Sequence, residues 1–252
     1  MEKFAGTGIC PGRVVGPVYR MAPAVEAPDE GETWDRSGTS VEAELARLTD
    51  AARAVQAELH SRADTAGGDA KALLETTALM AADPMLLQSA NAEIVAGVSA
   101  ERSIWEAGGQ VAEMLKGLGG YMARRMPDVL DVRSRIVAEL RGQPAAAVPS
   151  PGVPFILAAT YLAPADAATL DPAIVIGIVT TSGGPQSETA VLARNFGIPT
   201  VVGVRGTESL GDGATVYLDG TSGDVIREPG ESERMAASLW AGHGRGPVTR
   251  SL

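Results

Sequence analysis

A loop rich in glycine and hydroxyl groups near position 185 has the composition of an anion-binding site. The sequence reads TSGGPQSETAVLAR over 181–194 and GIPTVVG over 197–203. Gly183 and Gly184 let the backbone approach an anion closely and adopt positive φ. Residues 189–195 are typical of a short helix, whose first N–H groups have no partner within the helix. The loop is therefore either a phosphate cradle or a tight strand-to-helix turn without a ligand.

Side chains of the same run could take part in the chemistry. Glu188 stands at the positive end of the predicted helix dipole, where a carboxylate gains roughly 0.3–1 kcal/mol. Ser187 could contact an anion or serve only as the helix N-cap. Arg194 could help to bind the anion or only complement the dipole at the end of the helix. Thr189 completes the set of candidate phosphate-loop residues.

Two kinds of sequence pattern predict the elements that position this loop. Short runs of Val, Ile and Gly, bounded by Gly, Pro or Asp, predict strands at 13–19, 155–158, 174–179, 200–204, 215–218 and 224–226. From about 40 to 142 the apolar residues instead recur at helical spacing. They form three stripes, which we interpret as a helical core: Val41, Leu45, Leu48, Ala52, Val55 and Leu59; Ile104, Val111, Leu115 and Leu118; Val132, Ile136 and Leu140.

Strand-like sequence on both sides of the helical region predicts an α/β domain into which a helical domain is inserted. We place the α/β part at 1–21 and 149–228 and the helical part at 38–143. Proline and glycine mark an entry linker at 21–40 and a return at 143–154. Residues 229–252 predict one more helix, at 231–240, and a glycine-rich tail that has the composition of a cut linker.

Composition limits the possible partners and metal sites. The net charge of −10 in 252 residues argues against nucleic acid or an anionic membrane and favours a basic protein surface as partner. No segment is apolar enough to span a bilayer or to act as a signal peptide, so we expect a cytoplasmic protein. Cys10 is the single cysteine, which excludes an internal disulfide, and we expect it to be buried. His60 and His243 are far apart in sequence, so we predict no metal site and a surface position for each.

The loop resembles the phosphohistidine loop of phosphoenolpyruvate-dependent phosphotransferases, with Glu188 where the family has its phosphoryl-carrying histidine. Three further segments match the N-terminal domain of Enzyme I of the bacterial sugar phosphotransferase system: 6–12, 79–84 and 121–132. The resemblance covers nearly the whole chain. It implies a phosphohistidine (swivelling) α/β domain with an inserted four-helix-bundle-like subdomain that docks the small carrier protein HPr.

In that family the histidine takes a phosphoryl group from phosphoenolpyruvate and passes it to a histidine of HPr. Imidazole is suited to this because it is both a good nucleophile and a good leaving group near neutral pH. The resemblance also implies that phosphoenolpyruvate and Mg bind only to a C-terminal barrel, which this chain lacks, so we expect no cofactor here. A second departure is Ala167, where the family has a hydroxyl near the histidine, although Thr169 is close by.

Glu188 has three interpretations. It could be an engineered replacement of histidine that abolishes transfer or imitates the charge of phosphohistidine. It could mark a natural, non-catalytic relative that binds HPr as a regulator. It could also be a carboxylate nucleophile that forms an acyl phosphate. The swivelling domain of a pyruvate phosphate dikinase or phosphoenolpyruvate synthase is an alternative for the whole chain, but those enzymes lack the helical insertion.

The resemblance also places an HPr-docking surface on the helical insertion. By position, its members are Lys71, Glu75, Leu79, Met80, Asp83 and Arg125. Leu79 and Met80 could equally belong to the bundle core, and Asp83 could be a helix-terminal residue before Pro84. Thr77 replaces a histidine of the family. We expect the C-terminal barrel of the same enzyme as a further partner, and a monomer for the isolated domain.

Overall fold

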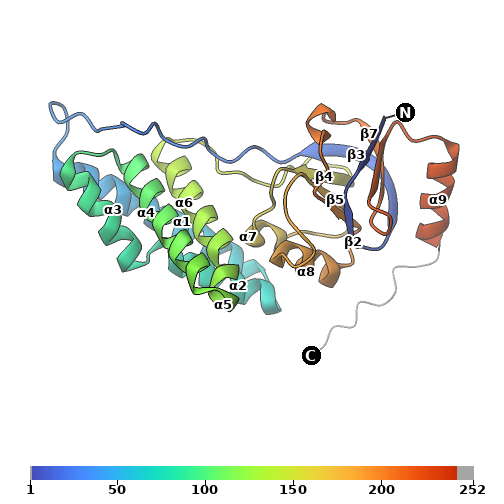
Figure 1. Ribbon diagram of the computed structural model, residues 1–252, viewed down its shortest axis with the longest axis horizontal. Coiled ribbons are helices and arrows are strands. Elements are labelled where there is room, and N and C mark those ends of the chain that lie inside the picture. Colours follow the sequence, from blue (N-terminus) through green and yellow to red (C-terminus); the bar gives the residue numbers. More distant parts are fainter. Residues whose placement is uncertain (1, 243–252) are drawn as a thin grey trace. The chain divides into compact units, whose positions relative to one another are not determined.

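The computed structural model describes residues 2–242, apart from the side chain of Glu188, and divides into two compact units. One unit combines Met1–Pro23 with Ala147–Leu252, and the other is Ala24–Ala146. The predicted α/β fold with an inserted helical subdomain is confirmed (Figure 1). The predicted surface residue His243 and most of the glycine-rich tail lie outside the described residues.

The α/β unit is built on an eight-stranded mixed sheet. Its strands are β1 Glu2–Ala5, β2 Thr7–Cys10, β3 Arg13–Arg20, β4 Phe155–Ala159, β5 Val175–Thr180, β6 Thr200–Val202, β7 Thr215–Asp219 and β8 Asp224–Arg227. They lie in the order β1-β8-β7-β3-β4-β5-β6-β2. The run β3-β4-β5-β6 is parallel and all other pairs are antiparallel. The carboxyl ends of the parallel strands meet at one edge, where ligands bind in open α/β sheets.

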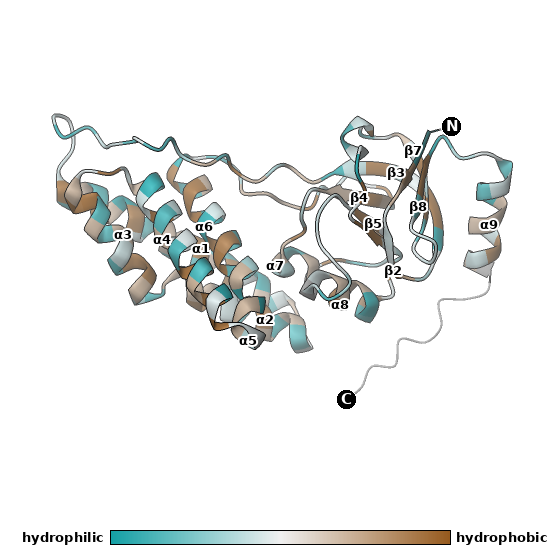
Figure 2. Cartoon of the chain, viewed as in Figure 1, coloured by the Kyte–Doolittle hydropathy of each residue, from teal (hydrophilic) through white to brown (hydrophobic). Residues whose placement is uncertain are grey.

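Helices cover this sheet and are held to it by apolar contacts. They are α7 Pro164–Ala167, α8 Glu188–Phe196 and α9 Glu231–Gly242, with a 3₁₀ turn at Thr207–Ser209. Figure 2 shows that hydrophobic residues concentrate in the strands. One apolar cluster joins β3, β4, β5, β7 and β8 through fully buried aliphatic residues such as Val18, Ile156 and Leu218. The helix predicted at 231–240 is present as α9.

Glycines let β2 cross the turn between β7 and β8 at very short range. A Cβ at Gly220 would lie 1.9 Å from the carbonyl oxygen of Cys10, and a Cβ at Gly8 would lie 2.5 Å from the carbonyl oxygen of Gly220. The Gly220 amide also donates to the carbonyl of Gly12 at 2.8 Å. The glycine-rich segment 6–12 is thus required by packing, and Cys10 is buried within it as predicted.

Asp219 holds the same turn together. Its carboxylate accepts hydrogen bonds from the backbone amides of Thr221 and Ser222 and, at 2.8 Å, from Nε of Arg13. Burial alone would raise the pKa of Asp219, but these hydrogen bonds outweigh burial and hold the pKa below its usual value. Burial and the neighbouring carboxylate raise the pKa of Tyr217 to about 12. The turn therefore carries a charged group that stays ionised near neutral pH.

The helical unit contains five long helices and one short one among the described residues. They are α1 Val41–Thr65, α2 Gly68–Ala81, α3 Pro84–Ala96, α4 Ala100–Leu118, α5 Gly120–Arg124 and α6 Met126–Leu140. Side-chain caps fix several starts: Ser40 accepts from the amide of Ala43, and Ser99 from that of Arg102. Arg125 is the C-cap of α5 and the N-cap of α6, so it separates the two helices.

Most of the predicted apolar stripes form the core of this unit. Leu48, Leu59, Ile104 and Ile136 are fully buried. One prediction is wrong: Leu118, the last residue of α4, is 63% exposed because the helix ends there and Gly119 turns the chain away. Within residues 2–242, every helix is too short or too polar to span a bilayer.

A charge network around the buried carboxylate of Glu44 joins α1, α4 and α6. The Glu44 carboxylate is almost fully buried and accepts from the amide of Ala100 at the start of α4. Arg47 donates to both oxygens of Glu44, to Glu101 and to the carbonyl of Leu140. A buried carboxylate is tolerated when it is paired in this way. The network therefore fixes how three helices meet.

The predicted linker 21–40 is in part a component of the helical unit. Thr33 forms a β-bridge with Val98, and the indole nitrogen of Trp34 donates to the carbonyl of Ile94 at 3.0 Å. Sequence analysis missed these contacts because proline and glycine in the segment indicate only that it is not helical. Its second half is a strap that is bound to the turn between α3 and α4.

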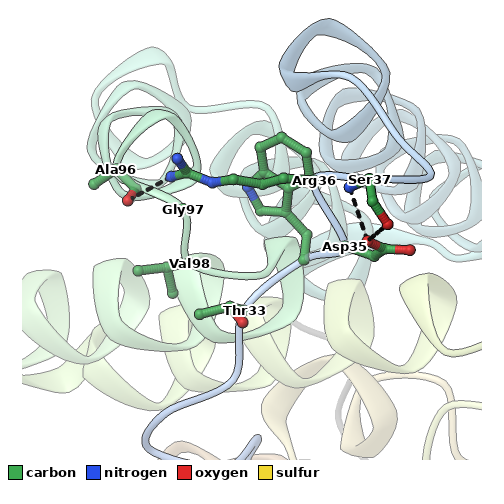
Figure 3. A pocket seen from close by; sticks show the side chains of 8 residues that line it. Thr33, Asp35, Arg36, Ser37, Ala96, Gly97 and Val98 are labelled. Atoms are coloured by element: carbon green, nitrogen blue, oxygen red, sulfur yellow. Dashed lines mark hydrogen bonds between the residues drawn. The ribbon is translucent and has the colours of Figure 1, made fainter.

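Arg36 extends this strap across the same turn (Figure 3). It donates to the carbonyl of Ala96 at 2.9 Å, and its guanidinium carbon lies 5.5 Å from the ring centroid of Trp34. Gly97 ends α3 with φ of +110°, and a Cβ there would lie 2.2 Å from a terminal nitrogen of Arg36. Gly97 thus serves both the helix end and the strap.

We predict that Gly220→Ala lowers the free energy of unfolding by about 3 kcal/mol or more, because the added Cβ meets backbone rather than a mobile side chain. Gly211→Ala is the matched control, since a Cβ there meets nothing within 4 Å. Urea unfolding of both variants measures the difference. Equal midpoints for the two variants would show that the crossing of β2 is looser than described.

Candidate functional site

The glycine loop connects β5 to α8 and is anchored at its start by one carbonyl group. The carbonyl oxygen of Thr160, which follows β4, accepts hydrogen bonds from the amide and hydroxyl of Ser182 and from the hydroxyl of Thr181. The amide of Thr181 donates to the carbonyl of Ala159 at 3.1 Å. The loop therefore begins at a fixed position at the carboxyl edge of the parallel strands.

The middle of the loop has a left-handed residue and open space beside its backbone. Gly183 has φ of +107°, a region that favours glycine. A Cβ at Gly184 would meet nothing within 4 Å, so the space in front of this residue is open. The amide of Ser187 donates to the carbonyl of Gly184 and closes the turn. The two glycines therefore leave the loop backbone accessible.

Helix α8 begins directly after this turn. Ser187 is its N-cap, and its hydroxyl accepts from the amide of Ala190 at 3.2 Å. Ala190 is fully buried against Ile9 and Val202, which seats the first turn of α8 on β2 and β6. Residue 188 is the first helical residue, while its carboxylate lies outside the part that the structure describes. The position of the family's histidine is thus the N-terminus of a nine-residue helix.

Arg194 ties the loop to the edge of the sheet. Its Nε donates to the carbonyl of Ile9 at 3.2 Å, and a terminal nitrogen donates to the carbonyl of Pro185 at 3.0 Å. Pro185 directly follows the two glycines. In this conformation Arg194 acts as a positioning residue for the loop backbone, a role that neither of the sequence-based interpretations contained.

Thr189, Ala167 and Thr169 lie near the start of α8 in different environments. The Thr189 side chain is buried, and its hydroxyl donates to the carbonyl of Leu162 at 2.8 Å. Ala167 is buried in α7, which packs against α8. The Thr169 hydroxyl donates to the carbonyl of Asp166 within its own turn.

Cys10 lies next to this site without the properties of a reactive thiol. Burial raises the pKa of Cys10, and the nearby charge of Arg194 opposes this only in part. Among the residues that the structure describes, no three His, Cys, Asp or Glu side chains are grouped to hold a metal ion. His60 is exposed, as predicted.

The candidate docking residues lie on the helical unit. Helix α2 carries several of them on its exposed face, and its other face belongs to the core. Lys71, Glu75 and Leu79 are exposed at spacings of four residues, and Leu79 is 64% exposed. Lys71 and Glu75 form an ion pair at 3.9 Å. The opposite face, which includes Leu74 and Thr77, is buried. The alternative that places Leu79 in the core is therefore wrong, and Thr77 is a core residue.

Met80, Asp83 and Arg125 have mixed environments. Met80 is half-buried, and Asp83 caps α3 by accepting from the amides of Met85 and Leu86. Arg125 is mostly buried and donates to Asp128 at 2.9 Å. Asp128 is buried, so removal of Arg125 would cost stability because a buried carboxylate would lose this charged partner. Arg125 is thus part of the helix junction as well as a candidate contact.

Sequence analysis missed exposed apolar side chains close to these positions. Met85 is 74% exposed at the start of α3, while Tyr121 and Met122 are 66% and 44% exposed on α5. The Tyr121 ring centroid lies 5.5 Å from the guanidinium carbon of Arg125. Exposed apolar groups of this kind mark interaction surfaces. The signal in the sequence was the apolar run 121–122 beside two glycines, where a buried stripe cannot continue.

Two protein-family models match the chain. One, described as PEP-utilising enzyme, N-terminal, matches residues 5–125, and the other, described as PEP-utilising enzyme, mobile domain, matches residues 152–223. A phosphoenolpyruvate-protein phosphotransferase of Streptomyces coelicolor is 41% identical over 92% of this chain and 42% of its own length. Another, from Haloferax volcanii, is 32% identical over 94% of this chain. The chain spans less than half the length of these two relatives.

Solved structures agree with these matches. A solution NMR structure of an Enzyme I protein superimposes with a TM-score of 0.79, at 27% identity, over 95% of this chain and 99% of that chain. The N-terminal domain of a nitrogen-type Enzyme I has a TM-score of 0.59 at 22% identity over 96% of this chain, which supports the fold alone.

We predict that Arg194→Gln loosens the glycine loop. The shorter side chain loses the hydrogen bonds to Ile9 and Pro185, so unfolding should require about 1 kcal/mol less free energy. Amide signals of Gly183 and Gly184 should shift and exchange faster in NMR spectra. The control Arg205→Gln changes an exposed arginine of the same unit. If Gly183 and Gly184 respond alike to both changes, Arg194 does not position the loop.

Proposed function

Since this chain belongs to the phosphoenolpyruvate-utilising enzymes, as the N-terminal domain of an Enzyme I, we propose that it is a phosphoryl-exchange and HPr-docking domain with an inactive acceptor position. One observation carries the proposal. Residue 188 opens α8 directly after the Ser187 cap, at the end of a glycine loop whose backbone is accessible and whose two ends are fixed. This is where an acceptor side chain needs to stand.

The loop supplies positioning and charge stabilisation, which are the main demands of phosphoryl transfer. A histidine at 188 would attack the phosphorus of phosphorylated HPr, form an N–P bond and release the nitrogen of the HPr histidine as leaving group. Glutamate cannot form this phosphoramidate. It carries one negative charge where a phosphoryl group carries about −1.5 to −2 and three acceptor oxygens. We therefore propose that Glu188 imitates the phosphorylated state incompletely and does not transfer.

We propose that phosphoenolpyruvate and Mg bind to another part of the enzyme. The chain corresponds to 42% of the Streptomyces coelicolor relative, and we propose that a C-terminal barrel in the remainder binds both. That barrel is then the second partner of this domain, beside HPr. A dikinase or synthase origin is not favoured, because the N-terminal family match runs through most of the helical insertion, up to residue 125.

A regulatory role is the second candidate function. The exposed stripe of Lys71, Glu75 and Leu79 belongs to the helical unit, whereas residue 188 belongs to the α/β unit. Docking through α2 therefore does not require the chemistry of residue 188. A chain with a natural glutamate there would bind HPr and withhold it from active Enzyme I. The codon for residue 188 in the parent gene distinguishes this role from that of an altered enzyme domain.

We predict that Glu188→His makes the domain a phosphoryl acceptor. Incubation with phosphorylated HPr should label the histidine variant, while the original chain and the control Glu188→Gln stay unlabelled. Phosphoenolpyruvate alone should label none of them. Mass spectrometry of the intact proteins measures the added phosphoryl group. Stable labelling of the original chain at Glu188 would contradict the proposed inactivity.

A folded Glu188→His variant that accepts nothing would point to Ala167. The double variant Glu188→His with Ala167→Thr restores the hydroxyl of the family at that position. Labelling of the double variant alone would show that the site carries two independent defects. Failure of both variants, with α8 intact by NMR, would overturn the assignment of this loop as the exchange site.

We predict that HPr binds through α2 in a salt-dependent manner, because this acidic chain would meet a basic face. Leu79→Ser should weaken binding about tenfold, as truncation of a central apolar contact commonly costs more than about 1 kcal/mol. Val95→Ser is the control, since Val95 is 59% exposed near the C-terminal end of α3 and is not a candidate docking residue. Calorimetric titration with HPr measures both. Equal losses for the two variants, or binding that follows residue 188, would place docking elsewhere.

A further inference from the structure

A solvent-open groove of about 390 Å³ lies beside α9 in the α/β unit. Its walls are the first residues of β3, Ile176 of β5 and one side of α9. It exists because β3 pairs with β4 only through Val18–Arg20, so the start of β3 has no parallel neighbour there. The volume falls in the range of small-molecule sites, roughly 300–1,000 Å³.

The floor of the groove is apolar because it joins two separate core clusters. Val14 and Ile176 pack against the large cluster of the sheet. Val15 packs with Ala237 of α9 in a smaller cluster. Small side chains on α9, including Ala237 and Ser238, line the groove and leave the space between the clusters unfilled. A hydrocarbon group placed there would cover half-buried aliphatic surface.

Two arginines line the same groove. Nε of Arg13 is bound to Asp219 at 2.8 Å, and Nε of Arg234 is bound to the carbonyl of Pro229 at 3.2 Å. Both guanidinium groups are thus tethered through Nε, and their terminal nitrogens form no hydrogen bond that the described residues provide. No acidic side chain lines the groove within residues 2–242. The charge of Arg13 is paired with Asp219, so Arg234 is the groove arginine without an acidic partner in the described part of the chain.

We propose that the groove binds a small amphipathic carboxylate. Terminal nitrogens of Arg13 and Arg234 would donate to the carboxylate oxygens, since guanidinium groups match carboxylates in geometry and charge. The hydrocarbon part would lie on Val14, Val15 and Ile176. The Ser238 hydroxyl is a further donor at the rim. This site is independent of the glycine loop and of HPr docking, and its ligand would join α9 to β3 and β5.

Octanoate is the probe that tests both halves of the proposal. NMR titration should give saturable shifts for Val14, Ile176 and Ala237, whereas acetate, which lacks the chain, and 1-octanol, which lacks the charge, should bind at least about tenfold more weakly. Arg234→Gln should weaken octanoate binding about tenfold, because it removes a charged hydrogen-bond donor. Arg205→Gln should change binding less than about twofold, since this exposed arginine does not line the groove.

A filling variant separates loss of charge from loss of space. Ser238→Leu places an apolar side chain at the rim of the groove, where the native residue is exposed, and should abolish octanoate binding without lowering the stability of the chain. The proposal is overturned if octanoate causes no saturable shifts at millimolar concentration. It is equally overturned if 1-octanol binds as well as octanoate, or if Arg234→Gln and Arg205→Gln have the same effect.

Discussion

The candidate site depends on the hydrogen bonds that the Thr160 carbonyl accepts from the glycine loop. Parallel pairing of β4 with β5 brings this carbonyl beside Thr181 and Ser182, and the loop start is fixed there. Arg194 holds Pro185 at the other end. Gly183 and Gly184 lie between these two anchors. An anion site needs amides that are already oriented, and the sheet supplies that order before any ligand binds.

Local sequence patterns predicted many of the elements, although not β1, β2, α2 or α3, and they did not predict how the elements are held together. The apolar stripes, the strand runs and the glycine loop are short-range signals, and the structure contains each of them. The role of Arg194 depends on Ile9, which is 185 residues away, and the packing of Gly220 depends on Cys10 on another strand. Such contacts arise from the topology of the fold, so no periodic pattern in a single sequence indicates them. Leu118 was misplaced because a stripe does not show where its helix leaves the core.

The candidate docking residues and the glycine loop belong to different units of the chain, and they differ in how much the sequence predicted. The exposed stripe on α2 follows from helical spacing once Leu74 and Thr77 are known to be buried. Arg125 could not be placed in this way, because its ion pair with Asp128 forms only where α5 and α6 meet. The same arginine is therefore both a part of the framework and a candidate contact. A loss of HPr binding in an Arg125 variant would not by itself identify an interface.

The strap in the second half of the segment 21–40 affects where the helical unit can be cut from the chain. Thr33, Trp34 and Arg36 bind the turn between α3 and α4, although they precede the first helix of the bundle. A cassette cut at the start of α1 would expose the carbonyl of Ile94 and the edge at Val98. A fragment that begins near Ala24 would keep the contacts of the strap with Ile94 and Val98. Grafting this bundle into another host protein therefore requires the preceding segment as well as the helices.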